Sequence, residues 1–161
     1  MNTIQINGCM ANSKTFLGTF SADKLPLRTT HALPFSFIAN TDPSHQPGTH
    51  WVGFFVTEEE VEVFDSYGRE MCPLFKRFIG SEKHICNEKQ VQQFGSSVCG
   101  QYCIYYIYQR ERGQSMTQIL SKFKHPDQND AYVRDWVHDR FSCRPAGPST
   151  TCIQGCKCFT H

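Results

Sequence analysis

The stretch CGQYCIYYIYQR, which covers residues 99–110, constrains the fold more than any other part of the sequence. Its apolar and aromatic residues recur around nearly the whole circumference of a helix instead of along one stripe. A helix of this kind must be covered on every side, because any exposed face would place apolar surface in water. The sequence therefore predicts a buried central helix over 99–110, which ends before Gly113.

The rest of the chain can supply one compact domain around that helix. The 161 residues are 39% hydrophobic and include 13 Phe, which is enough for a single core. The apolar runs are too short to cross a membrane, and the first residues lack the basic and apolar regions of a secretory signal. We therefore expect an intracellular protein that is not secreted and has no membrane partner.

Cysteine is unusually frequent, with nine residues in the chain. An odd count without a secretion signal argues against a disulfide framework and predicts free thiols. The last stretch, 142–161, contains four of the nine together with His161, but its C-x3-C-x-C spacing lacks the C-x2-C pairs of strong zinc sites. We expect a domain over 1–141 and a Cys-rich tail over 142–161, with no metal; a zinc site formed by the tail is the alternative.

The pattern of apolar residues and turn formers predicts an α+β fold, in which a small mixed or antiparallel sheet is packed by helices. Segment 50–57 is apolar on both faces, as in a strand inside a sheet, whereas the alternation in 60–65 predicts one wetter face. Ser115 and Asn129 are suitable N-caps for two later helices. The predicted strands are 32–40, 50–57, 60–65 and 85–92, and the predicted helices are 74–79, 99–110, 115–123 and 130–141.

The hairpin formed by the second and third of these strands places two titratable residues together. His50 begins one strand and Asp65 ends the other, and the outer ends of two strands joined by a tight turn are adjacent. A carboxylate in that position can accept a proton from one imidazole nitrogen and fix the tautomer. The other nitrogen is then free to act as a base.

A cysteine at the start of the central helix provides a candidate nucleophile. Cys99 follows the small-residue loop QFGSSV, and a thiol at a helix N-terminus is favoured as the thiolate by the helix dipole and by a nearby imidazolium. Gly95 and Gly100 leave room for a substrate backbone. The Gln93 amide, six residues before Cys99, and the Cys99 backbone N–H are candidate donors to an oxyanion.

Each of these residues also has an ordinary interpretation. A cysteine at a helix start is usually a small buried residue, a histidine after a loop is usually a surface residue, and an aspartate can simply shape a turn. The catalytic hypothesis rests on their order and placement together. The net charge of +1 does not favour strong phosphate binding, so the local basic clusters are interpreted as solvated faces.

The segment PGTHWVGFFVTEEEVEVFDSYG, followed by QFGSSVCGQYC, resembles the adenovirus cysteine endopeptidases (adenain) and the related SUMO/NEDD8-specific (Ulp-type) proteases. Members carry His-Trp on a strand, Asp or Glu one hairpin later, and then Gln and Cys-Gly at a helix start. The early segment TFLGTFSADKLP is similar to the adenain entry segment and favours the viral branch. The resemblance spans most of 14–141 and implies the adenain-like cysteine protease fold.

The resemblance implies a role for each residue of the motif. His50 would be the general base, and Asp65, where adenain has Glu, would orient it. Cys99 would be the nucleophile and Gln93 would line the oxyanion hole. Gln92 is the alternative for that last role, because the spacing from Gln to Cys differs between branches.

Substrate and partners are also implied by the resemblance. Trp51 and Gly100 would flank the substrate, although Trp51 is equally suited to filling the core. The implied reaction is cleavage after glycine, at Gly-Gly or Gly-X-Gly sites, in viral structural precursors, by a monomer in the host nucleus or virion. The resemblance implies two stimulators, which are DNA and a viral peptide linked to the protease through a cysteine. Cys86 is the candidate for that link. The alternative is that Cys86 is an ordinary free thiol.

Two other functions remain open from the sequence. One is a protease that acts on ubiquitin-like modifiers ending in Gly-Gly, as a deubiquitinase or deSUMOylase does. The other is a binding module that has kept the fold without catalysis. The complete set of four chemical residues argues against the second.

Overall fold

The computed structural model describes residues 1–141, and the predicted Cys-rich tail with His161 lies outside the described residues. The described chain is α+β, as the sequence predicts. Its elements in order are α1 (Thr3–Met10), β1 (Phe16–Phe20), the 3₁₀ turn η1 (Arg28–Thr30), β2 (Phe35–Asn40), β3 (Trp51–Val56), β4 (Val61–Phe64), α2 (Pro73–Ile79), β5 (His84–Cys86), α3 (Cys99–Arg110), α4 (Met116–Ser121) and α5 (Pro126–Phe141).

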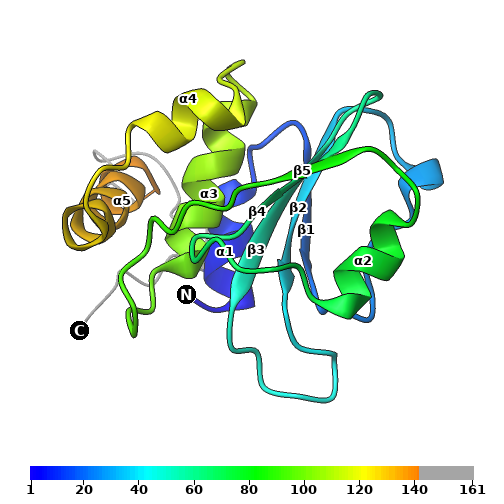
Figure 1. Cartoon of the computed structure of the whole chain (residues 1–161), viewed down its shortest axis with the longest axis horizontal. Helices are drawn as coiled ribbons and strands as arrows, with labels where there is room; N and C mark the ends of the chain where they lie inside the picture. The colour runs from blue at the N-terminus through cyan, green and yellow to red at the C-terminus, as the bar shows by residue number, and fades with distance from the viewer. Residues whose placement is uncertain (142–161) are drawn as a thin grey trace, which may run out of the picture.

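The strands form one mixed sheet in the order β1-β2-β3-β4-β5. The central strands β2, β3 and β4 are antiparallel to one another, whereas the edge strands β1 and β5 run parallel to their neighbours. Helices α1, α3, α4 and α5 lie on one side of the sheet and α2 lies on the other (Figure 1). Each side has its own apolar cluster, so the sheet is the middle layer between two cores.

Helix α3 is the buried central helix that the sequence predicts, with the predicted bounds. All of its residues except Tyr108 and Arg110 are buried, and it packs against β3, α1, α4 and α5. The Phe64 ring of β4 stacks on Tyr106 of α3 with a centroid distance of 4.5 Å. This packing fixes the position of the first turn of α3, where Cys99 lies, relative to the β3–β4 hairpin.

Several other predicted elements are confirmed. The hairpin joins β3 to β4, with Val56 paired to Val61 next to the turn. Helix α2 ends at Ile79 as predicted. Ser115 caps α4 with a capping box, in which its hydroxyl accepts from the backbone N–H of Gln118.

The strand predicted over 85–92 is shorter than expected. Strand β5 covers only His84–Cys86, because its partner β4 ends at Phe64 and the chain then turns. Beyond β5 the backbone bonds to that turn instead of to a strand, and the N–H groups of Val91 and Gln92 both donate to the Ser66 carbonyl oxygen. Residues 87–92 therefore cross over the turn and do not continue β5; we call this segment the strap.

The start predicted for the last helix is also wrong. Helix α5 begins at Pro126, whose fixed φ suits the first turn of a helix. Asn129 consequently lies inside the helix and does not cap it. Its side chain instead accepts from the N–H of Lys124 and donates to the carbonyl of Val91, which is buried.

The N-terminal helix α1 was not predicted from the polar first residues. Asn2 caps it through a capping box with Gln5. Its apolar surface is small, and only Ile6 and Met10 are buried among its residues, in the cluster that surrounds α3. The helix therefore depends on this tertiary packing more than on an amphipathic sequence pattern.

Glu62 corrects the expectation that strand 60–65 has a wet face. The side chain is buried on the α3 side of the sheet, where its carboxylate accepts both Nε and Nη2 of Arg110, at 2.6 and 2.7 Å. The hydroxyl of Tyr106 donates to the same carboxylate. Arg110 is thus the partner of a buried acid and not part of a solvated basic cluster.

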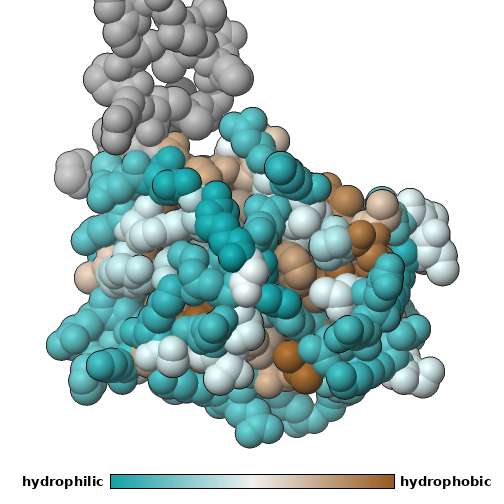
Figure 2. All heavy atoms as spheres, turned by 90° about the horizontal axis from the view of Figure 1, so that it is seen from above, coloured by the Kyte–Doolittle hydropathy of each residue, from teal (hydrophilic) through white to brown (hydrophobic). Residues whose placement is uncertain are grey.

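Figure 2 shows one face that is largely hydrophilic, with hydrophobic side chains in small separate groups. None of the helices within 1–141 has the length and apolar composition that a membrane crossing requires.

Substitution Glu62→Ala is expected to destabilise the protein by about 3–5 kcal/mol, because it leaves the Arg110 charge and the Tyr106 hydroxyl without their buried partner. The matched control is Glu60→Ala, which removes an ion pair with Lys83, a residue whose side chain is 70% exposed. That loss should stay within about 1 kcal/mol. Urea unfolding of the three proteins measures both values, and equal losses would contradict the assignment.

Candidate functional site

The end of the β3–β4 hairpin brings His50 and Asp65 into contact. His50 directly precedes β3 and Asp65 directly follows β4, so each lies just outside the paired strands. The Nε2 atom of His50 is 2.6 Å from Oδ1 of Asp65, and the histidine is 5% exposed. The hairpin geometry inferred from the sequence therefore holds, and the contact leaves Nδ1 of the ring for another partner.

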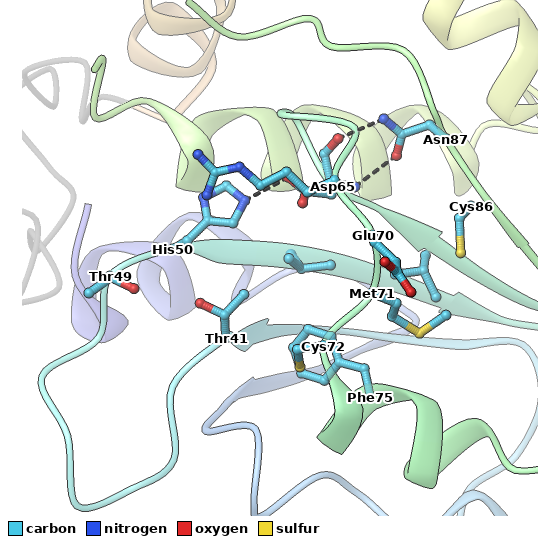
Figure 3. Close-up of a pocket in the computed structure, with 13 residues that line it drawn as sticks. Thr41, Thr49, His50, Asp65, Glu70, Met71, Cys72, Phe75, Cys86 and Asn87 are labelled. Carbon is cyan, nitrogen blue, oxygen red and sulfur yellow. Dashed lines mark hydrogen bonds and ion pairs between the residues drawn. The ribbon is translucent and has the colours of Figure 1, made fainter. Parts of the chain in front are cut away.

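Asp65 is held through both its side chain and its backbone. Its Oδ1 also accepts the backbone N–H of Tyr67 at 2.8 Å. Asn87, which is buried, accepts from the Asp65 N–H and donates to the Asp65 carbonyl, at 2.8 and 2.6 Å (Figure 3). Asn87 is a positioning residue that sequence reasoning missed, because an asparagine after a short strand has no distinctive signal.

A glycine allows the strap to lie against the acid-bearing turn. Gly68 has φ of 61° and donates its N–H to the Asp65 carbonyl. A Cβ atom at this position would lie 2.7 Å from the carbonyl oxygen of Glu88. Both the backbone conformation and the close approach therefore require glycine.

Cys99 begins α3 and lies within hydrogen-bonding reach of His50. Burial alone would raise the pKa of the thiol. The hydrogen bonds with His50 and with the backbone of Trp51, together with the imidazolium charge, outweigh burial and lower that pKa. Cys103, one turn further along the buried helix, has a pKa well above the usual value, mainly because of burial.

The imidazole of His50 lies between a carboxylate and a thiol. Burial would lower its pKa, but the hydrogen bonds to Asp65 and to Cys99 raise the pKa to about 9. The two shifts have opposite signs, as expected for a thiolate–imidazolium pair at neutral pH. Such a pair supplies a nucleophilic sulfur and a proton donor side by side.

The two glutamines before Cys99 have different environments. Gln92 is fully buried, accepts from the Ser66 hydroxyl at 2.6 Å, and donates to the Ser96 carbonyl at 2.8 Å. The Gln93 side chain is exposed and forms no hydrogen bond within the described residues. Gln92 therefore holds the loop in shape, whereas the amide of Gln93 is available.

A residue of α5 also holds this loop. The backbone N–H of Gln93 donates to Oδ1 of Asp130 at 3.3 Å, and the Tyr102 hydroxyl donates to the same oxygen at 2.9 Å. Asp130 is buried, so this contact ties the loop to α3 and α5 together. Sequence reasoning assigned no role to Asp130.

Trp51 and Gly100 lie side by side. The Trp51 indole N–H donates to the Met1 carbonyl at 3.0 Å. A Cβ atom on Gly100 would lie 3.1 Å from Met1 Cβ and 3.3 Å from Ile6. Both residues therefore pack against the N-terminal segment, and the core-filling interpretation of Trp51 accounts for its contacts.

A cavity of about 160 Å³ adjoins the His50–Asp65 pair. Cys86 lies on its wall, as labelled in Figure 3. This cysteine is exposed, has a free thiol, and ends the edge strand β5. Burial of the sulfur and the charge of Glu88 raise its pKa.

Among residues 1–141, no group of three or more His, Cys, Asp or Glu is placed to hold a metal ion.

No protein-family model and no curated protein sequence matches the chain. Among solved structures, the chain is similar to the ASFV pS273R protease, solved with selenomethionine, with a TM-score of 0.49 and 23% identity. The similarity covers 69% of this chain and 45% of that protease, so the chain spans less than half of the length of that structural neighbour.

Alkylation by iodoacetamide tests the thiolate. At pH 7 we expect Cys99 to react faster than Cys86, because its pKa is lowered and that of Cys86 is raised. Substitution His50→Gln removes the imidazole hydrogen bond and the imidazolium charge that lower the pKa of Cys99, so this pKa should rise and labelling at pH 7 should slow about tenfold or more. Peptide mapping by mass spectrometry over pH 5–10 measures each rate.

The matched control for that experiment is His45→Gln, which makes the same exchange at an exposed histidine. It should leave the pH profile unchanged. In the unsubstituted protein, labelling of Cys99 should fall only when acid protonates the thiolate below its lowered pKa. Identical profiles for His50→Gln and the unsubstituted protein would exclude the thiolate–imidazolium pair.

Proposed function

We propose that this protein is a cysteine endopeptidase. The observation that supports the proposal most directly is the position of His50, which bonds to Asp65 through Nε2 and interacts with the Cys99 thiol. The opposite pKa shifts of the cysteine and the histidine suit a nucleophile and its proton-transfer partner. Burial of His50 excludes bulk water from that proton-transfer pair.

In the proposed reaction, the thiolate of Cys99 attacks the carbonyl carbon of the scissile peptide bond. The carbonyl π electrons move to oxygen, and in this proposal the backbone N–H of Cys99 and the amide of Gln93 donate hydrogen bonds to that charge. The imidazolium of His50 then gives its proton to the departing amine as the C–N bond breaks. Neutral His50 takes a proton from water, whose oxygen attacks the thioester and releases the acid and the thiolate.

The proposed substrates are polypeptides cut after glycine, at Gly-Gly or Gly-X-Gly sites in viral structural precursors. The support is the motif resemblance together with the small residues that precede the thiol, Gly95, Ser96 and Ser97. Gly95 has φ of 78° and turns the loop in a conformation that residues other than glycine rarely adopt. Action in the host nucleus or virion is part of the same proposal.

Stimulation by a peptide or by DNA extends the proposal. Strand β5 is at an edge of the sheet, and Cys86 at its end is exposed with a free thiol, which suits an added strand linked by a disulfide. For DNA, the support is the resemblance alone. Assays with and without each stimulator belong in the test below.

A cleavage screen is the direct test. Fluorogenic peptides with Gly-Gly or Gly-X-Gly before the reporter should be cut, and their alanine-substituted versions should be cut at least about tenfold more slowly. Cys99→Ala should abolish turnover, whereas Cys9→Ser is a thiol-matched control on α1. Cleavage restricted to ubiquitin-like modifiers would support the modifier-specific alternative, and an active Cys99→Ala protein would refute the nucleophile.

The two glutamines give a second test. Gln93→Ala should slow turnover by about a hundredfold through loss of an oxyanion donor, with little change in stability. Gln92→Ala should instead lower the free energy of unfolding by about 1–3 kcal/mol, because the Ser66 hydroxyl and the Ser96 carbonyl lose a buried partner. Measurements of thermal unfolding and of kcat for both variants distinguish the loss of stability from the loss of turnover. Unchanged turnover in Gln93→Ala would remove that residue from the site.

A further inference from the structure

Beside the candidate site lies a group of three residues to which the proposed mechanism gives no role. We name Tyr67, Arg69 and Phe94 the aromatic ledge. The Tyr67 ring lies 4.9 Å from the His50 ring, and the Phe94 ring lies 5.8 Å from Tyr67. The ledge thus extends from the candidate base toward the loop that precedes Cys99.

Tyr67 fixes the ledge to the site. Its backbone N–H donates to Asp65, and its hydroxyl donates to the Ser96 carbonyl at 3.0 Å and accepts from Gln92 at 3.2 Å. The tyrosine therefore joins the acid-bearing turn to the loop. A residue stacked on this ring has a fixed position relative to the nucleophile.

Phe94 is exposed to an unusual degree for a phenylalanine. Its side chain is 73% exposed, although the neighbouring loop residues Gln92 and Val98 are buried. Core packing does not account for an aromatic ring in this position. A large apolar ring at the rim of a candidate site is suited to contact with a ligand.

Arg69 provides a positive charge that no acidic side chain of the described residues neutralises. Its guanidinium carbon lies 4.3 Å from the Tyr67 centroid and 6.0 Å from the Phe94 centroid, and it forms no ion pair within residues 1–141. The two nearest acidic residues in sequence are already engaged, Glu70 by Lys76 and Asp65 by His50. The stacked guanidinium therefore keeps its edge donors available, in a fork that matches a carboxylate.

We propose that the aromatic ledge is a specificity subsite that binds an acidic side chain of the polypeptide substrate, with Arg69 pairing to its carboxylate and Phe94 covering its methylene groups. The inference rests on the proposed endopeptidase function. Arg69 also lines the cavity next to His50 and Asp65, so a carboxylate bound there would lie close to the candidate base.

The test compares peptides that share one cleavable glycine core and carry Asp, Glu, Ala or Lys at each flanking position in turn. At one flanking position, we expect kcat/KM to be about five to ten times higher for an acidic residue than for alanine. Substitution Arg69→Gln should reduce this ratio to about one, and Arg69→Glu should reverse it in favour of lysine. Raising the salt concentration from 0.05 to 0.5 M should also reduce the ratio, because the site is open to solvent.

The matched control is Arg77→Gln, which removes the same charge from an exposed arginine on α2. It should keep the acidic preference. Phe94→Ala should lower kcat/KM for glutamate more than for alanine peptides, because glutamate has the longer stem.

The outcomes separate the two proposals. If the unsubstituted protein cuts no peptide, the endopeptidase function fails. If it cuts peptides but shows no acidic preference, or Arg69→Gln keeps that preference, the ledge proposal alone fails. A preference for an aromatic residue that Arg69→Gln abolishes would indicate stacking on the guanidinium and would also overturn the acidic assignment.

Discussion

The packing of α3 against β3 is the constraint on which the candidate site depends. Because α3 is apolar around its circumference, it must lie between the sheet and the other helices, and its first turn then meets the end of the hairpin. Cys99 is the first residue of that helix, and His50 directly precedes β3. The contact between these two residues thus follows from the packing of the core, and the rigid core keeps their relative position fixed.

A second set of contacts keeps the acid in place. The turn after β4 presents Asp65, and the strap after β5 is bonded to that turn through Asn87 and through the Ser66 carbonyl. The same strap continues into Gln92, which spans from Ser66 to Ser96 ahead of the thiol. One continuous hydrogen-bond network therefore connects the acid-bearing turn with the loop that delivers Cys99, which explains why polar residues are buried there.

Much of this arrangement could be predicted from local patterns. The helix over 99–110 follows from a long apolar segment that ends before Gly113, and the hairpin of β3 and β4 follows from two strand-like segments separated by a short turn. The pairing of His50 with Asp65 follows from the hairpin, because adjacent strands have a fixed geometry. Predictions failed where a partner far along the chain decided the outcome: Glu62 is buried because Arg110 reaches it, and the strand over 85–92 ends because β4 ends. Helix α1, with few apolar residues of its own, is held mainly by α3 and β1.

The sequence by itself determined the α+β class, the buried helix and the set of residues with the chemistry of a thiol nucleophile, a base and an acid. Only the tertiary structure decided which glutamine is held inside the loop and which is free, that Asn87 and Tyr67 hold Asp65, and that Arg69 and Phe94 form a ledge beside His50. The physical reason is the separation along the chain between the residues that interact. Periodicity and capping act over a few residues, whereas hydrogen-bond partners and ring contacts join segments that only the packed chain brings together.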